Sequence, residues 1–293
     1  MDMYDTILVP TDGCELAEAA VDGAVALAER HDAALHVIHV LELGEFPDDA
    51  ASEAADELSR EADQFLASVV SAGDQVGVTP TTRVVESERA VHREIAEYAD
   101  DHDIDLIVMG THGRRGIDQR LLGSTTERTL RVSPIPVLTM HEGAVLDSDF
   151  ETILVPTDGS DVANAAADHA IGLADGTDAA LHVVHVVDVA ATSRLGESAA
   201  VLAGLEDAGR EAVDDVIGRA DEAEVRSVQA SVLSGSPARS ILDYTDDHDI
   251  GLIVMGTHGR SGLERYLIGS VTETVTRLAD VPVLSVPDRS DGG

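Results

Sequence analysis

The chain contains no lysine, and all 19 of its basic residues are arginines. The 56 aspartate and glutamate residues far outnumber them, so the 293-residue chain carries a net charge of -37. Because nucleic-acid backbones are bound through clustered positive charge, this balance argues against a nucleic-acid partner. At molar salt the Debye length falls to roughly 3 Å, which screens repulsion within such a surface. We therefore expect a halophilic protein from a very salty cytoplasm rather than a generic acidic protein.

Tryptophan is also absent, and the chain has only three phenylalanines, four tyrosines and one cysteine, Cys14. A single cysteine excludes an intrachain disulfide, and aliphatic side chains must supply the core. No run approaches the ~18 apolar residues that a membrane helix needs. The N-terminus, Met1–Asp5, lacks the basic and apolar regions of a signal peptide. We therefore expect a cytoplasmic protein with no membrane segment.

The sequence repeats itself once along its whole length. TILVPTDG at Thr6–Gly13 recurs at Thr152–Gly159, LHVIHV at Leu35–Val40 recurs as LHVVHV at Leu181–Val186, and LIVMGTHGR at Leu106–Arg114 recurs at Leu252–Arg260. Each repeat is displaced by 146 residues. Units of this length are domains rather than solenoid repeats. We predict two tandem domains, residues 1–145 and 146–293, joined through an acidic linker.

Each copy alternates short apolar runs with helical patterns, which indicates an α/β fold with a parallel sheet flanked by helices. In copy one the five predicted strands are Thr6–Pro10, Leu35–Leu41, Thr81–Val85, Leu106–Met109 and Pro136–Met140. Small apolar residues follow helical spacing after each first strand: Ala17, Ala20, Val21, Ala24, Leu27 and Ala28, repeated as Ala163, Ala166, Ala167, Ala170, Leu173 and Ala174. These residues predict a helix that lies close against the sheet.

A glycine-rich loop follows the fourth strand of each copy. Gly110-Thr-His-Gly113 is separated by nine residues from Gly123-Ser124, and Gly256-Thr-His-Gly259 is separated by nine from Gly269-Ser270. Glycines allow a backbone to approach a phosphate, and a helix N-terminus favours anions. Ser124–Glu127 and Ser270–Glu273 also match capping boxes, so the alternative is a loop that only starts a helix. Recurrence in both copies favours an anion site.

Two other phosphate motifs do not fit. A Walker A loop needs a lysine, which this chain lacks. The dinucleotide-binding sequence GxGxxG should follow the first strand, but the turn there reads Pro10-Thr-Asp-Gly13. Asp12 and Asp158 lie at that turn, where each could bond a ribose hydroxyl or adenine, or could cap the following helix.

In each half of the chain the pattern Gly-x2-Gly-x9-Gly-Ser is preceded by an ILVPTDG strand and followed by a PVL strand. In this arrangement both halves resemble the ATP-binding branch of the universal stress protein family. The resemblance implies a Rossmann-like fold, similar to adenine nucleotide alpha hydrolases, with ATP, with or without Mg²⁺, across the strand ends. It implies that copy one holds the nucleotide with Pro10, Asp12, Val40, Met109, Gly110, Gly113, Arg114, Gly123, Ser124, Thr125 and Thr126. The matching residues of copy two are Pro156, Asp158, Val186, Met255, Gly256, Gly259, Arg260, Gly269, Ser270, Val271 and Thr272.

Copy one departs from the family pattern at two places. It has Gly13-Cys14 where copy two has the usual Gly159-Ser160, and Arg89-Ala-Val91 where copy two has Gly235-Ser-Pro237. Neither change touches the glycine motif, so we predict two sites, with copy two the more typical.

The histidines do not suggest a metal site. His36 and His39, like His182 and His185, are three residues apart on a strand and so point to opposite faces. His112 and His258 stand inside the glycine loops, where they either touch phosphate or flank the turn. Cys14 is either a redox-sensitive thiol at a helix start or a small residue packed there. We assign no metal ligand.

Composition and motifs supply no convincing general base for hydrolysis, so no catalytic residue is assigned. The leading hypothesis is a non-enzymatic nucleotide-binding module of the stress response. Alternatives are a slow ATP hydrolase or phosphotransferase that uses the same pocket, and a structural partner protein whose loops bind nothing. The resemblance further implies that the last strands, Ile135–Met140 and Val281–Val286, pair within the chain as a pseudo-dimer or between chains as a homodimer.

Overall fold

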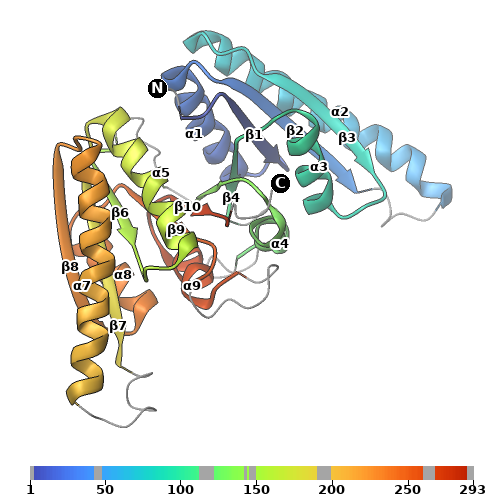
Figure 1. Cartoon of the computed structure of the whole chain (residues 1–293). Coiled ribbons are helices and arrows are strands. Elements are labelled where there is room, and N and C mark those ends of the chain that lie inside the picture. The colour runs from blue at the N-terminus through green and yellow to red at the C-terminus, as the bar shows by residue number, and fades with distance from the viewer. Residues whose placement is uncertain are drawn as a thin grey trace. The chain divides into compact units, whose positions relative to one another are not determined.

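A computed structural model describes residues 3–42, 48–111, 122–141, 144, 150–189, 199–259 and 268–288 (Figure 1). The chain divides into two compact units, one spanning Asp2–Ser148 and the other Asp149–Gly293. Both units have the same architecture, as the internal repeat predicts.

The described residues of the first unit form a parallel sheet and four helices. The strands are β1 (Thr6–Thr11), β2 (Ala34–Glu42), β3 (Thr81–Ser87), β4 (Leu106–Gly110) and β5 (Val137–Met140), in the order β3-β2-β1-β4-β5. The helices are α1 (Glu15–His31), α2 (Asp48–Val76), α3 (Val91–Asp101) and α4 (Ser124–Val132). The strand order reverses between β1 and β4, which is where open parallel sheets bind ligands.

The described residues of the second unit repeat this plan. The strands are β6 (Thr152–Pro156), β7 (Ala180–Asp188), β8 (Ser227–Gly235), β9 (Leu252–Gly256) and β10 (Val283–Val286), in the order β8-β7-β6-β9-β10. The helices are α5 (Asp161–Thr177), α7 (Ala199–Glu222), α8 (Pro237–Asp247) and α9 (Ser270–Leu278). The predicted α/β fold of two tandem parallel sheets is therefore confirmed.

Each sheet lies between two pairs of helices (Figure 1). In the first unit α1 packs beside α2, and α3 packs beside α4; in the second unit α5 packs beside α7, and α8 packs beside α9. Because helices on both faces cover the sheet, the middle of the central strand β1 is apolar, and Ile7, Leu8 and Val9 are fully buried.

Small residues bring the first helix of each unit close to the sheet. Ala166, Ala167 and Ala170 of α5 are completely buried, as the spacing of apolar residues predicts. At Gly256, the last residue of β9, a Cβ atom would lie 2.8 Å from Val162 Cγ1 and 3.1 Å from the Val162 carbonyl carbon. Such contacts are too short, so Gly256 is required by the approach of α5.

Candidate functional site

The loop after the first strand is fixed by two consecutive turns. In copy two the Gly159 amide donates to Thr157 Oγ1 (3.1 Å), and the Ser160 amide donates to Asp158 Oδ1 (3.0 Å). Gly159 has a φ of 75°, in the left-handed region that favours glycine. Copy one has equivalent bonds, from Gly13 to Thr11 Oγ1 and from Cys14 to Asp12 Oδ1, each 3.1 Å long. Both loops are therefore preformed.

The aspartates of these loops are not the caps of the following helices. The N-cap of α5 is Ser160, whose Oγ accepts from the Ala163 amide (3.3 Å), and the N-cap of α1 is Cys14, whose Sγ accepts from the Ala17 amide (3.4 Å). Of the two interpretations of Asp12 and Asp158, helix capping is therefore wrong. The position of Cys14 agrees with a small residue packed at a helix start.

Asp158 lies directly against the glycine motif of copy two. A Cβ atom built on Gly259 would lie 2.3 Å from Asp158 Oδ2, which is impossible without movement. The loop after β6 and the loop after β9 therefore meet at the carboxyl edge of the sheet. This contact places two predicted site residues, far apart in sequence, beside each other.

The second part of the motif closes the loop onto the strand end. The Gly269 amide donates to the Thr257 carbonyl (2.7 Å), and the Gly123 amide donates to the Thr111 carbonyl with the same length. A Cβ atom on Gly269 would lie 3.1 Å from His258 Cα and 3.4 Å from the Thr257 carbonyl oxygen. Thr257, His258 and Gly269 are thus packed together.

Helices α4 and α9 begin at this edge without a side-chain cap. Their N-caps are Gly123 and Gly269, and neither helix has a side-chain hydrogen bond at its cap. The capping boxes at Ser124 and Ser270 are not formed, because these serines are the first helical residues and not the N-caps. The first-turn amides of an α-helix have no partner inside the helix, and they carry its positive dipole end. This edge therefore offers amide donors suited to an anion.

The third helical residue attaches each of these helices to the sheet. The Thr126 hydroxyl donates to the Gly110 carbonyl (2.8 Å), and the Thr272 hydroxyl donates to the Gly256 carbonyl (2.7 Å). Both threonines are buried. Their hydroxyl protons hold the helix N-terminus at the end of β4 or β9, so these residues position the amides of the first turn.

The remaining predicted residues lie around the same edge of each sheet. Pro10, Val40, Met109 and Gly110 are at or near the carboxyl ends of β1, β2 and β4, and Pro156, Val186, Met255 and Gly256 hold the same places on β6, β7 and β9. Met255 packs with Val275 and Val283 in the core beneath the edge. Ser124, Thr125, Ser270 and Val271 belong to the first turns of α4 and α9. Gly113, Arg114, Arg260 and His112 lie outside the described residues.

The histidines of the second strands do lie on opposite faces of the sheet. His182 Nδ1 is 3.0 Å from the hydroxyl of Tyr244 in α8. His185 Nδ1 donates instead to the Thr157 carbonyl (2.9 Å), and its ring lies against Gly209 of α7, where a Cβ atom would be 2.4 Å from His185 Cδ2. His185 therefore holds the start of the site loop, a role that sequence reasoning missed. Only the bulk of the ring and the matching glycine on α7 could have indicated it.

The start of α3 is a second feature that sequence reasoning missed. The Ser87 hydroxyl donates to Glu94 Oε1 (2.7 Å), and Arg89 Nε pairs with the same oxygen (2.7 Å). Arg89 also pairs with Glu97. This network replaces the Gly235-Ser-Pro237 turn of copy two, and the only signal of it in the sequence was the departure at Arg89-Ala-Val91.

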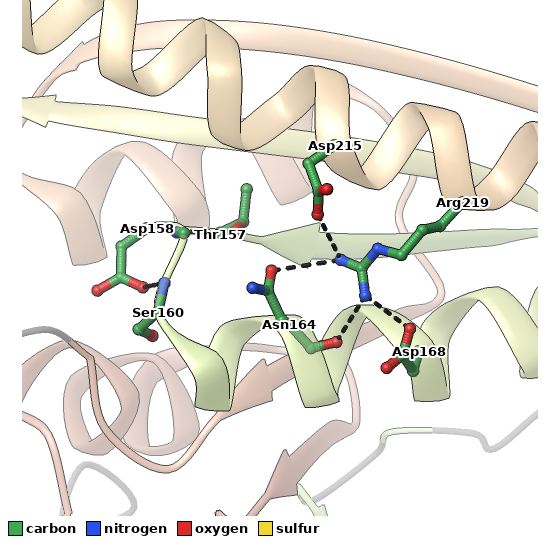
Figure 2. Close-up of polar contacts among 8 residues, drawn as sticks. Thr157, Asp158, Ser160, Asn164, Asp168, Asp215 and Arg219 are labelled. Atoms are coloured by element: carbon green, nitrogen blue, oxygen red, sulfur yellow. Dashed lines mark hydrogen bonds and ion pairs between the residues drawn. The ribbon is translucent and has the colours of Figure 1, made fainter.

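Copy two has its own ion-pair network behind the site. Figure 2 shows Arg219 of α7 reaching α5, where it donates to the Asn164 carbonyl (3.2 Å), Asn164 Oδ1 (3.3 Å) and Asp168 Oδ1 (2.6 Å). Asp215, one turn earlier on α7, pairs with the same guanidinium (3.3 Å). In copy one the repeat places Gly73 at the position of Arg219, so this network belongs to copy two alone.

The described part of the chain contains neither a metal-binding cluster nor a membrane-spanning helix. Among these residues no group of three or more histidine, cysteine or acidic side chains is placed to hold a metal ion. None of the helices described is long and apolar enough to cross a membrane.

Fold and site together define an α/β protein in which, in each repeat, a helix without a side-chain cap begins at the carboxyl edge of the sheet. The family model of the universal stress proteins matches residues 3–141 and again residues 149–287. The chain therefore belongs to the universal stress protein family, as a tandem member.

Known relatives agree with this assignment. A universal stress protein of Methanocaldococcus jannaschii is 41% identical over 140 residues, which cover 47% of this chain and 82% of that protein. One from Mycolicibacterium smegmatis is 28% identical over 97% of each chain. The crystal structure of a universal stress protein from Archaeoglobus fulgidus is 26% identical, with a TM-score of 0.74 over 98% of this chain and 100% of that one.

Proposed function

We propose that each copy binds ATP or another adenine nucleotide at the carboxyl edge of its sheet, and that the protein acts as a binding module in the stress response. The observation that carries this proposal is the start of α4 and α9, where a glycine N-cap leaves the first-turn amides without a side-chain acceptor. A terminal phosphate supplies the acceptor that these donors lack.

The rest of the edge supports the same ligand. The Asp158 carboxylate accepts a hydrogen bond from the Ser160 amide and lies against Gly259. It is therefore at the junction of the loop after β6 and the loop after β9. There it is placed to accept from a ribose hydroxyl or from the adenine amino group. The first-turn amides of Ser270 and Val271, and of Ser124 and Thr125 in copy one, are the donors for the phosphate, because the Gly269 and Gly123 amides are already bonded to Thr257 and Thr111. Mg²⁺, where present, would arrive with the phosphates, because that ion is commonly held by phosphates and one or two carboxylates.

The test uses a charge placed at the helix start. Ser124→Asp and Ser270→Asp put a carboxylate on the exposed first residue of α4 and α9, where it repels a phosphate but suits the helix dipole. Calorimetric titration with ATP in molar KCl should give about two sites for the parent chain and one for each variant. Ser124→Asn and Ser270→Asn are neutral controls of the same size.

Two results would overturn the proposal. Adenine nucleotides could fail to bind the parent chain at millimolar concentration, or binding could be unchanged in the double Asp variant. Steady release of phosphate from ATP, lost in the double Asp variant, would replace the binding module with the slow hydrolase. Pairing through the last strands, within the chain or between chains, stays a prediction of the family resemblance, and sedimentation at several protein concentrations tests it.

A further inference from the structure

Three positively charged or titratable residues lie within the first two turns of the neighbouring helices α3 and α4 in copy one. His92 and Arg93 are the second and third residues of α3, and Arg128 is the fifth residue of α4. The two helices pack side by side, and both begin at the carboxyl edge of the sheet. Partial burial lowers the pKa of His92, and the charges of Arg128 and Arg93 lower that pKa further, while Glu42 at the end of β2 acts in the opposite direction.

The helix carboxylates that could neutralise these arginines are engaged elsewhere. Glu97 lies four residues after Arg93, a spacing that allows an ion pair on a helix, but it pairs with Arg89 instead. Arg89 also pairs with Glu94. On α4, Glu127 pairs with Arg131. Among the described residues neither Arg93 nor Arg128 has an ion pair with a carboxylate. Glu42 offsets at most one of the two arginine charges, so the cluster is cationic on a chain whose net charge is -37.

Copy two lacks this cluster, although its helices occupy the same places. The repeat sets Ala238 at the position of His92 and Thr274 at the position of Arg128. Arg239, at the position of Arg93, pairs with Asp243 (3.4 Å), the residue four positions later. The two copies differ because of Arg89. Copy two has Gly235 in its place, and glycine has no side chain to pair with Asp243, so Asp243 pairs with Arg239.

Bringing cations together costs free energy, and an anion between them recovers it. We propose that His92, Arg93 and Arg128 form a phosphate-binding subsite beside the nucleotide edge of copy one, so that copy one takes a nucleotide with a second, separate phosphate group while copy two does not. This inference rests on the proposed function, because it adds one group to the ligand held at Gly123. Two arginines and a protonated imidazole provide the charge-assisted donors that a phosphate needs.

The subsite can be tested without a nucleotide. Inorganic phosphate is titrated into the full chain carrying Ser270→Asp, which blocks the helix-terminal site of copy two; Ser124 is kept, because an aspartate there would lie four residues before Arg128 and pair with it. We expect phosphate to bind copy one about tenfold more weakly after Arg128→Gln or Arg93→Gln, and with unchanged affinity after the matched Arg239→Gln in copy two. Binding should weaken as KCl rises, and less steeply in the Arg128→Gln variant.

A proton readout separates the subsite from general surface attraction. Above the lowered pKa His92 is neutral, and a bound phosphate favours its charged form, so binding near neutral pH should take up a proton. The binding enthalpy should then depend on the ionisation enthalpy of the buffer, and His92→Gln should abolish that dependence. Absence of phosphate binding, or phosphate binding that none of the three substitutions changes, would overturn the subsite.

A comparison of two nucleotides tests whether the subsite and the carboxyl edge of copy one bind the same ligand. In the otherwise unmodified chain, an adenosine with phosphates on both its 5′ and 3′ hydroxyls should bind copy one about tenfold more tightly than AMP, and Arg128→Gln should remove the difference. If neither nucleotide binds while phosphate still does, the proposed function fails and the subsite stands. If both nucleotides bind copy one equally, the role in nucleotide choice is overturned and the proposed function stands.

Discussion

The phenol ring of Tyr244 is stacked on the imidazole of His248, with ring centroids 3.8 Å apart and planes inclined by 11°. The Tyr244 hydroxyl lies 3.0 Å from Nδ1 of the buried His182. Copy one repeats the arrangement, with Tyr98 stacked on His102 at 3.9 Å and its hydroxyl 3.0 Å from His36 Nδ1. These clusters lie towards the amino ends of β2 and β7, away from the carboxyl edge of each sheet.

This arrangement makes stability depend on pH. Burial, and then the charge of His248, lowers the pKa of His182, and burial with His102 does the same for His36. Because the folded-state pKa lies below the ordinary value of 6.5, the unfolded chain takes up protons first as pH falls. Stability is therefore fully present above that value and is lost as pH falls from it through the folded-state pKa.

Thermal unfolding in molar KCl at several pH values measures this effect. His36→Gln and His182→Gln should each reduce the loss of melting temperature on acidification, and their effects should add, because the residues belong to different units. An acid dependence that survives intact in the double variant would contradict the assignment.

Thr272→Val tests the attachment of α9 to the sheet. The substitution preserves shape but removes the hydroxyl that donates to the Gly256 carbonyl, and it leaves that acceptor buried without its partner. We expect a loss of about 1–3 kcal/mol in the free energy of unfolding, measured by denaturant titration. Thr274→Val on the same helix is the control, because its exposed hydroxyl bonds Ser270, and it should change stability by less than about 0.5 kcal/mol.

Gly256→Ala and Gly204→Ala should act in opposite directions. The new methyl at position 256 would meet Val162, so we expect a cost of about 1–3 kcal/mol from overpacking. Gly204 is inside α7 with nothing within 4 Å of a Cβ atom, so alanine there should stabilise the protein by about 0.5–1 kcal/mol. Melting temperatures that move in the same direction would refute the packing argument.

Arg219→Met should loosen α7 from α5 in copy two. The side chain is only 27% exposed and bonds three oxygen atoms of α5, so we expect a loss of about 1–3 kcal/mol (Figure 2). Arg226→Met is the control, because Arg226 is 61% exposed and pairs with an Asp178 that is 71% exposed. Such exposed pairs contribute roughly 0–1 kcal/mol. Equal losses in the two variants would contradict a special role for Arg219.

Salt should stabilise this protein strongly. With a net charge of -37, repulsion among carboxylates is large in dilute buffer and is screened as KCl rises. We expect the melting temperature to rise steadily towards molar KCl, and sucrose to give a smaller gain because it leaves the repulsion unscreened. A maximum at low ionic strength would argue for an ordinary acidic protein.

Much of the fold could be predicted because it depends on local patterns. Alternation of apolar runs and helical spacing gave the strand and helix order, and Ala166 and Ala170 are buried where the spacing places them. The candidate edge followed from parallel topology, since the ends of β1 and β4 must lie together. Details of the edge could not be predicted, because Gly123 rather than Ser124 is the N-cap, and that choice depends on how the loop closes onto Thr111.

The sequence by itself determined the duplication, the α/β class and the glycine spacing, because each is a periodic property of the chain. Only the tertiary structure decided which partner each polar atom takes. Asp158 meets Gly259, His185 holds the Thr157 carbonyl, and Arg89 draws Glu97 away from Arg93. These pairings arise where separate loops and helices converge, and convergence depends on side-chain packing over the whole sheet rather than on neighbours in the chain.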